Sequence, residues 1–297
     1  MEGLTFVENF AYERDWKRCR HCGTNENIKI YKIDEKKITR TAGVDNLITL
    51  CKDCYNKKFF NEEENVCWVI LAGWKGTRMA PITNFLNKHE LPVGNRPMVF
   101  HPLFTLRELW IKNVLVIFER YNTGRMIEAL GNGREFGMEI TYRIQHWAGG
   151  IADALSLAKD FVWNRNFYVI LGDNIFDNNE IGKFKKSVNP KVFIKQVANP
   201  DEYWIGEIID WKINRIIEKP KQYIGNMAVT GLYHYTPDVF DIIQWLRPSW
   251  RDELEITDIN NYYLKEWKLD YEIIESYWVD SWCNLSSYIE ANKIFNL

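Results

Sequence analysis

Residues 66–78 read Val-Cys-Trp-Val-Ile-Leu-Ala-Gly-Trp-Lys-Gly-Thr-Arg, an apolar run that leads into a turn containing two glycines. An apolar run bounded by a turn is typical of a strand buried on both faces. The turn can direct backbone N–H groups at phosphates, and Arg78 would add a charged fork beside them. The stretch therefore predicts a buried strand with an anion-binding turn at its carboxyl end.

Four further apolar runs follow, and longer helix-like stretches separate them. They cover residues 113–118, 139–144, 167–171 and 191–197. Apolar strands that alternate with helices predict a Rossmann-like α/β fold, with a mostly parallel sheet covered on both faces. In such folds ligands bind beyond the carboxyl ends of the strands, so Gly172-Asp173-Asn174, which follows the 167–171 run, is a candidate site.

The chain of 297 residues has room for one large domain and one small one. The polar stretch 61–65 separates them, so we expect domains at 1–62 and 66–297. A net charge of -2 gives no general attraction to nucleic acid or to an anionic membrane. No apolar run reaches the roughly 18 to 20 residues that cross a bilayer, and the first residues do not form a signal peptide. We therefore expect a cytoplasmic protein with no membrane partner.

Two Cys-x-x-Cys pairs mark the small domain. They are Cys19 with Cys22 and Cys51 with Cys54. Four thiolates can close a tetrahedral structural zinc site, which would replace the core that about 60 residues build poorly. The alternative is four surface thiols without a metal.

This segment also resembles the HNH endonuclease family, through the cysteine pairs and the stretches 28–34 and 45–56. Where that family has histidines, this chain has Tyr31, Lys32 and Tyr55. The resemblance thus implies a zinc-bound ββα module that lacks the base for phosphodiester cleavage. Residues 1–60 carry 12 Lys or Arg against 9 Asp or Glu, a surplus too slight to favour nucleic acid. Contacts with nucleic acid, with the large domain or within a homo-oligomer all stay open for this module.

The large domain carries a series of motifs in one order. They are 71–78, Lys88 with 91–92 and 96–98, Gln145 with Gly150, 171–176, 218–220, 229–233, 253–260 and 278–280. In this order they resemble the sugar-1-phosphate nucleotidyltransferase family, and most closely its glucose-1-phosphate thymidylyltransferase branch, over residues 66–293.

The resemblance implies that a sugar 1-phosphate attacks the α-phosphorus of a nucleoside triphosphate, dTTP first and UTP second, and releases pyrophosphate. Arg78 and Lys88 would be the catalytic cations on the triphosphate. Asp173 and Asp280 would hold Mg²⁺. The nucleotide would contact Leu71, Gly73, Gly76, Thr77, Gln145 and Gly150, and the sugar phosphate would contact Asn174, Glu218, Lys219 and Val229. Such a site aligns two anions and neutralises the charge that develops between them.

Three tryptophans, Trp74, Trp204 and Trp282, stand where the family has glycine. A side chain in place of a ligand-contacting glycine would fill the pocket or move the backbone, unless the tryptophans point outwards. The alternative function is a catalytically altered nucleotide-binding protein whose zinc module docks on nucleic acid. Six charged residues retained at the predicted site favour the enzyme.

Overall fold

The computed structural model describes residues 6–15, 17–19, 24–32, 47–52, 67–73, 83, 87–109, 111–120, 123–177, 181, 187–281 and 285–295. The chain divides into two compact units, Met1–Asn65 and Val66–Leu297, called unit 1 and unit 2 below. None of the helices in these ranges is both long and apolar enough to cross a membrane.

In unit 1, helix α1 (Phe6–Arg14) precedes an antiparallel pair of strands, β1 (Ile28–Lys32) and β2 (Leu47–Cys51). Arg14 Nη2 donates to the Leu47 carbonyl at 2.7 Å, and the Asp15 carboxylate accepts from the Thr49 N–H at 2.9 Å. These two bonds attach the end of α1 to β2. The predicted ββα order includes a helix after the second strand, and residues 53–66 lie outside the described residues.

Unit 2 is built on a sheet of nine strands in the described part of the chain, with the order β12-β11-β13-β8-β3-β6-β7, while β10 pairs with β13 and β14. The strands are β3 (Cys67–Leu71), β6 (Asn113–Glu119), β7 (Glu139–Gln145), β8 (Phe167–Leu171), β10 (Lys191–Gln196), β11 (Trp204–Ile209), β12 (Lys212–Glu218), β13 (Met227–Tyr235) and β14 (Asp270–Ile273).

The central strands β8, β3, β6 and β7 are parallel, which confirms the α/β fold with a mostly parallel central sheet. All five predicted strands are present. The last of them, β10, pairs with β13 in antiparallel fashion rather than joining the parallel set. Strands β11, β12 and β13 form an antiparallel extension that the apolar runs did not predict. In β11 and β12 buried positions mix with exposed polar ones, whereas β13 is buried almost throughout.

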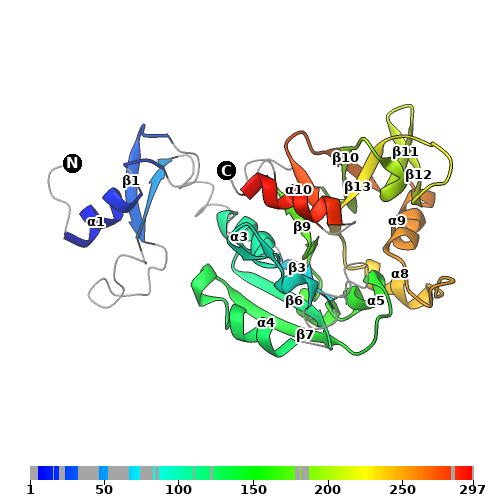
Figure 1. Cartoon of the computed structure of the whole chain (residues 1–297), viewed down its shortest axis with the longest axis horizontal. Helices are drawn as coiled ribbons and strands as arrows, with labels where there is room; N and C mark the ends of the chain where they lie inside the picture. Colours follow the sequence, from blue (N-terminus) through cyan, green and yellow to red (C-terminus); the bar gives the residue numbers. More distant parts are fainter. Residues whose placement is uncertain are drawn as a thin grey trace. The chain divides into compact units, whose positions relative to one another are not determined.

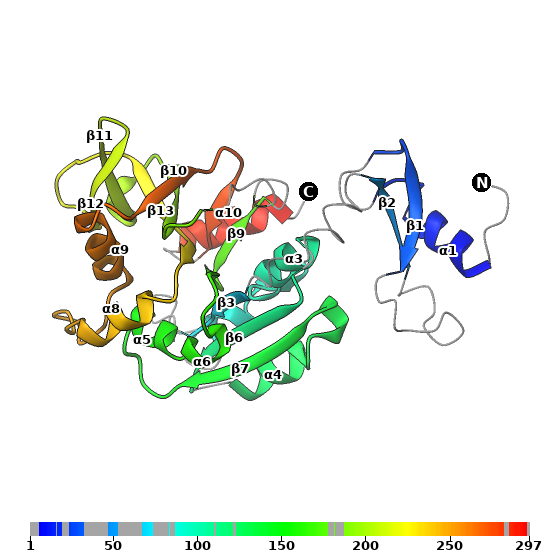
Figure 2. The ribbon, with the colours of Figure 1, turned by 180° about the vertical axis from the view of Figure 1, so that it is seen from behind.

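Alternate residues of β3 explain why helices cover both faces of the sheet. Val69 and Leu71 pack in the core under α5, α6, α8 and α9, whereas Trp68 and Ile70 pack in the core under α3 and α4. Because every residue of β3 is buried, the strand is apolar throughout. The helices are α3 (Phe100–Glu108), α4 (Thr123–Leu130), α5 (Ile151–Ser156), α6 (Lys159–Val162), α8 (Val239–Trp245) and α9 (Ile256–Lys265). Figure 1 and Figure 2 show α8, α9 and the β11–β12 hairpin at one end of unit 2, and β7 with α4 at another.

Several short elements complete unit 2. They are η4 (Lys88–Glu90), β4 (Pro92–Val93), β5 (Arg96–Pro97), η5 (Arg134–Phe136), β9 (Asn174–Phe176), η6 (Pro200–Glu202), β15 (Trp278–Asp280) and α10 (Leu285–Phe295). The β4–β5 hairpin is held by α10, where the Tyr288 hydroxyl donates to the Pro92 carbonyl at 2.6 Å and Asn292 Oδ1 accepts from the Gly94 N–H at 3.0 Å. Helix α10 therefore supports the hairpin that directly follows η4.

Candidate functional site

The carboxyl ends of β3 and β8 meet at the glycine turn. The Gly172 N–H donates to the Leu71 carbonyl at 2.8 Å, and a Cβ on Gly73 would lie 2.8 Å from the Glu119 nitrogen. Backbone packing of this kind leaves no room for a side chain at Gly73. The rest of the predicted phosphate turn, with Gly76, Thr77, Arg78 and Trp74, lies outside the described residues.

Asp173 and Lys88 form a buried ion pair at this edge of the sheet. Their residues are 6% and 3% exposed, and the Lys88 Nζ donates to Asp173 Oδ2. Burial alone would raise the pKa of Asp173, but the Lys88 charge and hydrogen bonds from Lys88 and Asn174 outweigh it and lower that pKa. Asp173 is therefore ionised at neutral pH, as a metal ligand must be.

The second predicted metal ligand reaches the same place from a distant part of the chain. Strands β9 and β15 pair in antiparallel fashion, with Asp280 opposite Asn174. The next residue, Ser281, donates from its N–H and its hydroxyl to the Asp173 carbonyl, at 3.0 and 2.7 Å. This pairing brings Asp173 and Asp280 together across more than a hundred residues of sequence.

Tyr233 lies close enough to both aspartates to be affected by their charges. Burial, and then the charges of Asp280 and Asp173, raise the pKa of Tyr233 above its usual value. Its hydroxyl is buried and has no hydrogen-bond partner among the described residues. Tyr233 was not among the site residues predicted from the sequence, although it lies within the 229–233 motif.

Asn174 connects the elements of the site. Its Nδ2 donates to Asp173 Oδ1 at 3.0 Å, while its Oδ1 accepts from the Gly231 N–H at 2.9 Å and from the Trp278 indole at 2.6 Å. A Cβ on Gly231 would lie 2.5 Å from Asn174 Cγ, so only glycine fits there. Asn174 was predicted to contact sugar; in the structure its oxygen holds β13 and β15 beside β9.

His89, next to Lys88, is fully buried against the turn at Gly172, which follows β8. A Cβ on Gly172 would lie 2.8 Å from its ring, and its Nδ1 lies 2.9 Å from Asn87 Oδ1. Burial and the nearby Lys88 ammonium lower the pKa of His89 to about 3. The ring is thus neutral at physiological pH, and it packs against the turn without adding charge to the site.

Gln145 and Gly150 lie at the end of β7 and the start of α5. Gln145 Nε2 donates to the Gly150 carbonyl at 3.2 Å and to Asp153 Oδ2 at 2.7 Å. Gly150 has a φ of +93°, and a Cβ there would collide with the Leu254 carbonyl oxygen. The Leu254 N–H in turn donates to the Gly149 carbonyl at 2.7 Å. The predicted base-reading residues are therefore packed against the 253–260 motif.

Glu218 and Lys219 lie at the end of β12. Arg251 binds both carboxylate oxygens of Glu218, at 3.0 and 2.8 Å, and also binds Glu255 at 2.9 Å. Lys219 adopts a φ of +42°, and its N–H donates to the Tyr203 carbonyl at 2.9 Å. Arg251 was not predicted as a site residue, and the available signal was a basic residue just before two glutamates of the 253–260 motif.

Val229, which was predicted to contact the sugar phosphate, and Trp204, which stands where the family has glycine, lie wholly and partly in the core. Val229 is 2% exposed and belongs to the core under α5, α8 and α9. Trp204 faces Glu218 across the β11–β12 pair, and its partly buried side chain packs against the same core. Trp204 therefore does not point outwards, and its bulk is accommodated by the core. Trp282 lies outside the described residues.

Two metal sites were predicted, one for Mg²⁺ at Asp173 and Asp280 and one for Zn²⁺ at the four cysteines of unit 1. The described residues include both magnesium ligands but only two of the cysteines. They contain no group of three or more His, Cys, Asp or Glu side chains arranged to hold an ion. Magnesium is usually held by one or two carboxylates together with substrate phosphates, so Asp173 and Asp280 fit this pattern. In unit 1 Cys19 and Cys51 are buried, at 1% and 7% exposure. Cys22 and Cys54 lie outside the described residues, so the zinc site stays a prediction.

The parallel strands, with the buried Asp173–Lys88 pair beyond their carboxyl ends, form an α/β arrangement that fits the predicted nucleotidyltransferase class. The family model described as "Nucleotidyl transferase" matches residues 68–296. The chain belongs to the nucleotidyl transferase family, which confirms the family predicted from the motif order.

Named relatives agree with this assignment. The chain is 36% identical to a glucose-1-phosphate thymidylyltransferase of Neisseria meningitidis over 212 residues, which cover 69% of this chain and 74% of that enzyme. It is 34% identical to a low-salt glycan biosynthesis nucleotidyltransferase of Haloferax volcanii over 232 residues, which cover 76% of this chain and 65% of that protein. The chain thus spans less than two thirds of the Haloferax protein's length.

Solved structures share the fold. A Bacillus anthracis protein assigned as a glucose-1-phosphate thymidylyltransferase, in complex with a sucrose, matches with a TM-score of 0.71 and 42% identity, covering 78% of this chain and 95% of that one. A UDP-glucose pyrophosphorylase complexed with UDP-glucose matches with a TM-score of 0.67 at 23% identity, covering 77% of this chain and 98% of that one. The second likeness concerns the fold alone.

Proposed function

We propose that this protein transfers a nucleotidyl group from a nucleoside triphosphate to a sugar 1-phosphate and releases pyrophosphate. The observation that carries the proposal is the buried Asp173–Lys88 pair beside Asp280, at the carboxyl ends of the central strands of a nucleotidyl transferase fold. Names of relatives at 36% identity favour a thymidine nucleotide and glucose 1-phosphate as the first substrates to test. A uridine nucleotide is the second choice.

The oxygen of the sugar phosphate attacks the α-phosphorus while the bond to pyrophosphate breaks. Both reactants are anions, so the site must hold them in line and offset the charge that develops on the leaving group. In the proposal Lys88 and Arg78 bind the triphosphate, and the backbone of the turn with Leu71, Gly73, Gly76 and Thr77 supplies N–H donors. Lys219 binds the sugar phosphate, and Glu218 accepts hydrogen bonds from sugar hydroxyls.

Asp173 and Asp280 would hold Mg²⁺, which when bound would supply positive charge to the triphosphate oxygens. In the structure the Lys88 ammonium pairs with the Asp173 carboxylate. If Asp173 held Mg²⁺ together with Asp280, the Lys88 ammonium would be available to bind the triphosphate.

In this proposal, Gln145 and the Gly150 backbone recognise the base of the nucleotide. The Gln145 amide is held by Gly150 and Asp153, which leaves its carbonyl oxygen as an acceptor for a base N–H. Thymine and uracil both carry such an N–H, whereas cytosine lacks it at that ring nitrogen. The geometry thus favours dTTP and UTP over CTP.

The proposed function is tested by pyrophosphate release from the purified protein with Mg²⁺, using each common nucleoside triphosphate with a panel of sugar 1-phosphates. We expect turnover with dTTP or UTP, and a loss of about 100-fold or more in kcat for Asp173→Asn. Asp201→Asn, which removes an exposed carboxylate on η6, is the matched control and should keep full activity.

Two outcomes would contradict parts of this proposal. Turnover that survives Asp173→Asn would remove the assigned metal site but leave the activity. No turnover from a folded protein that binds nucleotide would remove the activity and favour the binding-protein alternative.

We further propose that Cys19, Cys22, Cys51 and Cys54 hold one structural zinc ion in unit 1. The burial of Cys19 and Cys51 in a small unit supports this, because a metal would add stability that such a core lacks. Elemental analysis should give one zinc per chain, and Cys51→Ser should lose it. Zinc content equal in the two proteins would contradict the site.

A further inference from the structure

A groove of about 1720 Å³ lies in unit 2 between the β11–β12 turn, β12, α9 and β14. None of its lining residues is among those that the proposed function uses for nucleotide, sugar phosphate or Mg²⁺. The groove is therefore a feature that the proposed reaction does not explain.

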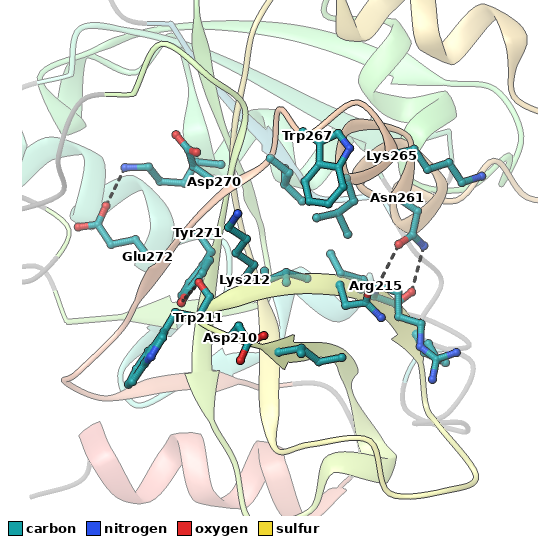
Figure 3. A pocket seen from close by; sticks show the side chains of 18 of the residues that line it. Asp210, Trp211, Lys212, Arg215, Asn261, Lys265, Trp267, Asp270, Tyr271 and Glu272 are labelled. Carbon is teal, nitrogen blue, oxygen red and sulfur yellow. Dashed lines mark hydrogen bonds and ion pairs between the residues drawn. The ribbon is translucent and has the colours of Figure 1, made fainter.

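Two tryptophans stand at this groove with their rings open to solvent. Trp211 is 86% exposed and Trp267 is 84% exposed. In Figure 3 their rings lie on either side of Lys212, and Tyr271 adds a third ring near Trp211. Single exposed aromatic side chains are common on protein surfaces and need no explanation. Several of them gathered at one concave surface indicate a binding site.

Both tryptophans occupy backbone positions where glycine is usual. Asp210 and Trp211, with φ of 49° and 61°, form the two-residue turn between β11 and β12, which normally favours asparagine and glycine. Trp267 has a φ of 57° just after α9, where a glycine commonly ends the helix. A bulky residue in this conformation is strained, and neither exposed ring gains core packing in return. Core packing therefore does not account for either ring, and both are left open to a ligand at the groove.

The walls of the groove are fixed in place. The Tyr271 hydroxyl donates to the Trp211 carbonyl at 3.0 Å, and the Lys212 ammonium lies 5.8 Å from the Trp267 ring centre. The Asn261 amide on α9 both donates to and accepts from the Ile216 backbone at 3.0 Å, so the outer edge of β12 is already paired there. A partner that adds a strand to β12 is therefore disfavoured, while a preformed groove favours a ligand laid into it.

The charges of the groove cancel. Of the 21 residues that line it, four are Lys or Arg and four are Asp or Glu. Lys191 and Glu272 pair with each other at 2.8 Å. A phosphate-rich or nucleic-acid ligand would need a positive surplus, and the centre of a protein interface is depleted of charged residues. The lining therefore matches a neutral ligand that offers both apolar faces and many hydroxyl groups.

We propose that this groove binds a neutral oligosaccharide. A sugar ring presents a face of C–H groups, which can pack on an indole, and a rim of hydroxyls, which can bond to the charged side chains around it. The volume exceeds the roughly 300 to 1,000 Å³ of a pocket for one small ligand, so several linked sugar residues fit better than one.

The ligand class agrees with the fate of the product of the proposed function. A nucleoside-diphosphate sugar is an activated glycosyl donor, and glycosyl transfer to a carbohydrate acceptor is one class of reaction that consumes it. A saccharide groove away from the proposed reaction site would hold the protein near such acceptors. This last link rests on the proposed function, whereas binding itself does not require turnover.

The test is native gel electrophoresis of the full chain through gels that contain dextran, mannan or xylan, followed by calorimetry with hexasaccharides of the polymer that retards it. We expect retardation by at least one polymer, and affinity about tenfold or more weaker for Trp211→Ala and for Trp267→Ala. Trp163→Ala is the matched control, since Trp163 is 79% exposed with a φ of 58° and lies outside the groove. It should bind like the original protein.

Two results would overturn the proposal: no retardation by any of the three neutral polymers, whether or not dextran sulfate retards the protein, or equal retardation of all three variants. Pyrophosphate release measured on the same samples keeps the two proposals apart. Saccharide binding without pyrophosphate release would contradict only the proposed function. Pyrophosphate release without saccharide binding would contradict only the saccharide groove.

Discussion

Gly231 sets how closely β13 approaches β9. A Cβ there would lie 2.5 Å from Asn174 Cγ, and the Gly231 N–H donates to Asn174 Oδ1. Asn174 in turn donates to Asp173. A methyl group at Gly231 would thus displace the Asn174 side chain, and through it the hydrogen bond to Asp173, the proposed metal ligand.

We expect Gly231→Ala to lower the free energy of unfolding by about 1 to 3 kcal/mol, as overpacking does, and to reduce kcat. The matched control is Gly206→Ala on β11, where a Cβ would lie 3.7 Å from Ile213, an ordinary contact. Urea unfolding and pyrophosphate release measure the two effects. Equal results for both variants would refute the role given to Asn174.

His101 on α3 should make the stability of unit 2 depend on pH. The ring is 6% exposed, its Nε2–H donates to the Val93 carbonyl at 3.0 Å, and it contacts Phe295 of α10. Burial, reinforced by the charge of Arg96, lowers the pKa of His101 to about 4. The folded state therefore keeps the ring neutral where an unfolded chain would already be protonated.

As pH falls below about 6.5 the unfolded chain binds this proton first, so stability decreases down to about pH 4, by at most about 1.4 kcal/mol per pH unit. His101→Gln, whose amide can still donate to Val93, should show a flatter dependence over that window. Urea unfolding at pH 7, 6 and 5 measures it, and the other titrating groups cancel in the comparison. Parallel curves for the two proteins would contradict the prediction.

At the scale of elements, the segment between α8 and α9 joins two parts of the proposed substrate site. Arg251 binds Glu218 at the end of β12, and Leu254 pairs with the backbone at Gly149 and Ala152. Arg251, which lies outside β12, therefore fixes the orientation of the Glu218 carboxylate.

We expect Arg251→Ala to raise the KM for the sugar 1-phosphate by about tenfold, because Glu218 loses a bidentate partner, with a smaller effect on the KM for the triphosphate. Arg215→Ala is the control, since Arg215 forms the same kind of pair with Glu207 on a more exposed part of β12. Steady-state kinetics with each substrate varied gives the split. A larger change in the KM for the triphosphate than in the KM for the sugar 1-phosphate would contradict the assignment of Glu218 to the sugar.

The central strands were predictable from the sequence, whereas the edge hairpin was not. The β3, β6 and β8 runs were found because each is buried on both faces and so is apolar without interruption. Strands β11 and β12 were not predicted, because residues such as Glu207 and Arg215 interrupt the apolar pattern on an edge hairpin. The β9–β15 pair was not predicted either, since strands of three residues are too short to show a periodic pattern.

At the scale of the whole molecule, every described residue assigned to the reaction lies in unit 2. Unit 2 also has its own cores on both faces of the sheet. We therefore expect a protein made of residues 66–297 to fold and to keep kcat within about twofold of the full chain, because each such core can stabilise a domain by itself. Calorimetry and pyrophosphate release test this. A folded but inactive fragment would show that unit 1 contributes to the reaction.

The sequence by itself determined the family and the central strands, because strands buried on both faces impose a continuous apolar pattern. It also predicted the site residues, among them Asp173 and Asp280, but not the antiparallel ribbon that brings these two together. Only the tertiary structure supplied Arg251 as the partner of Glu218, the Asn174 contact that requires Gly231, the core packing of Trp204, and the groove between Trp211 and Trp267. The physical reason is the same in each case: these contacts join residues from 14 to more than a hundred positions apart, and neither propensity nor spacing records which distant side chain a fold brings near.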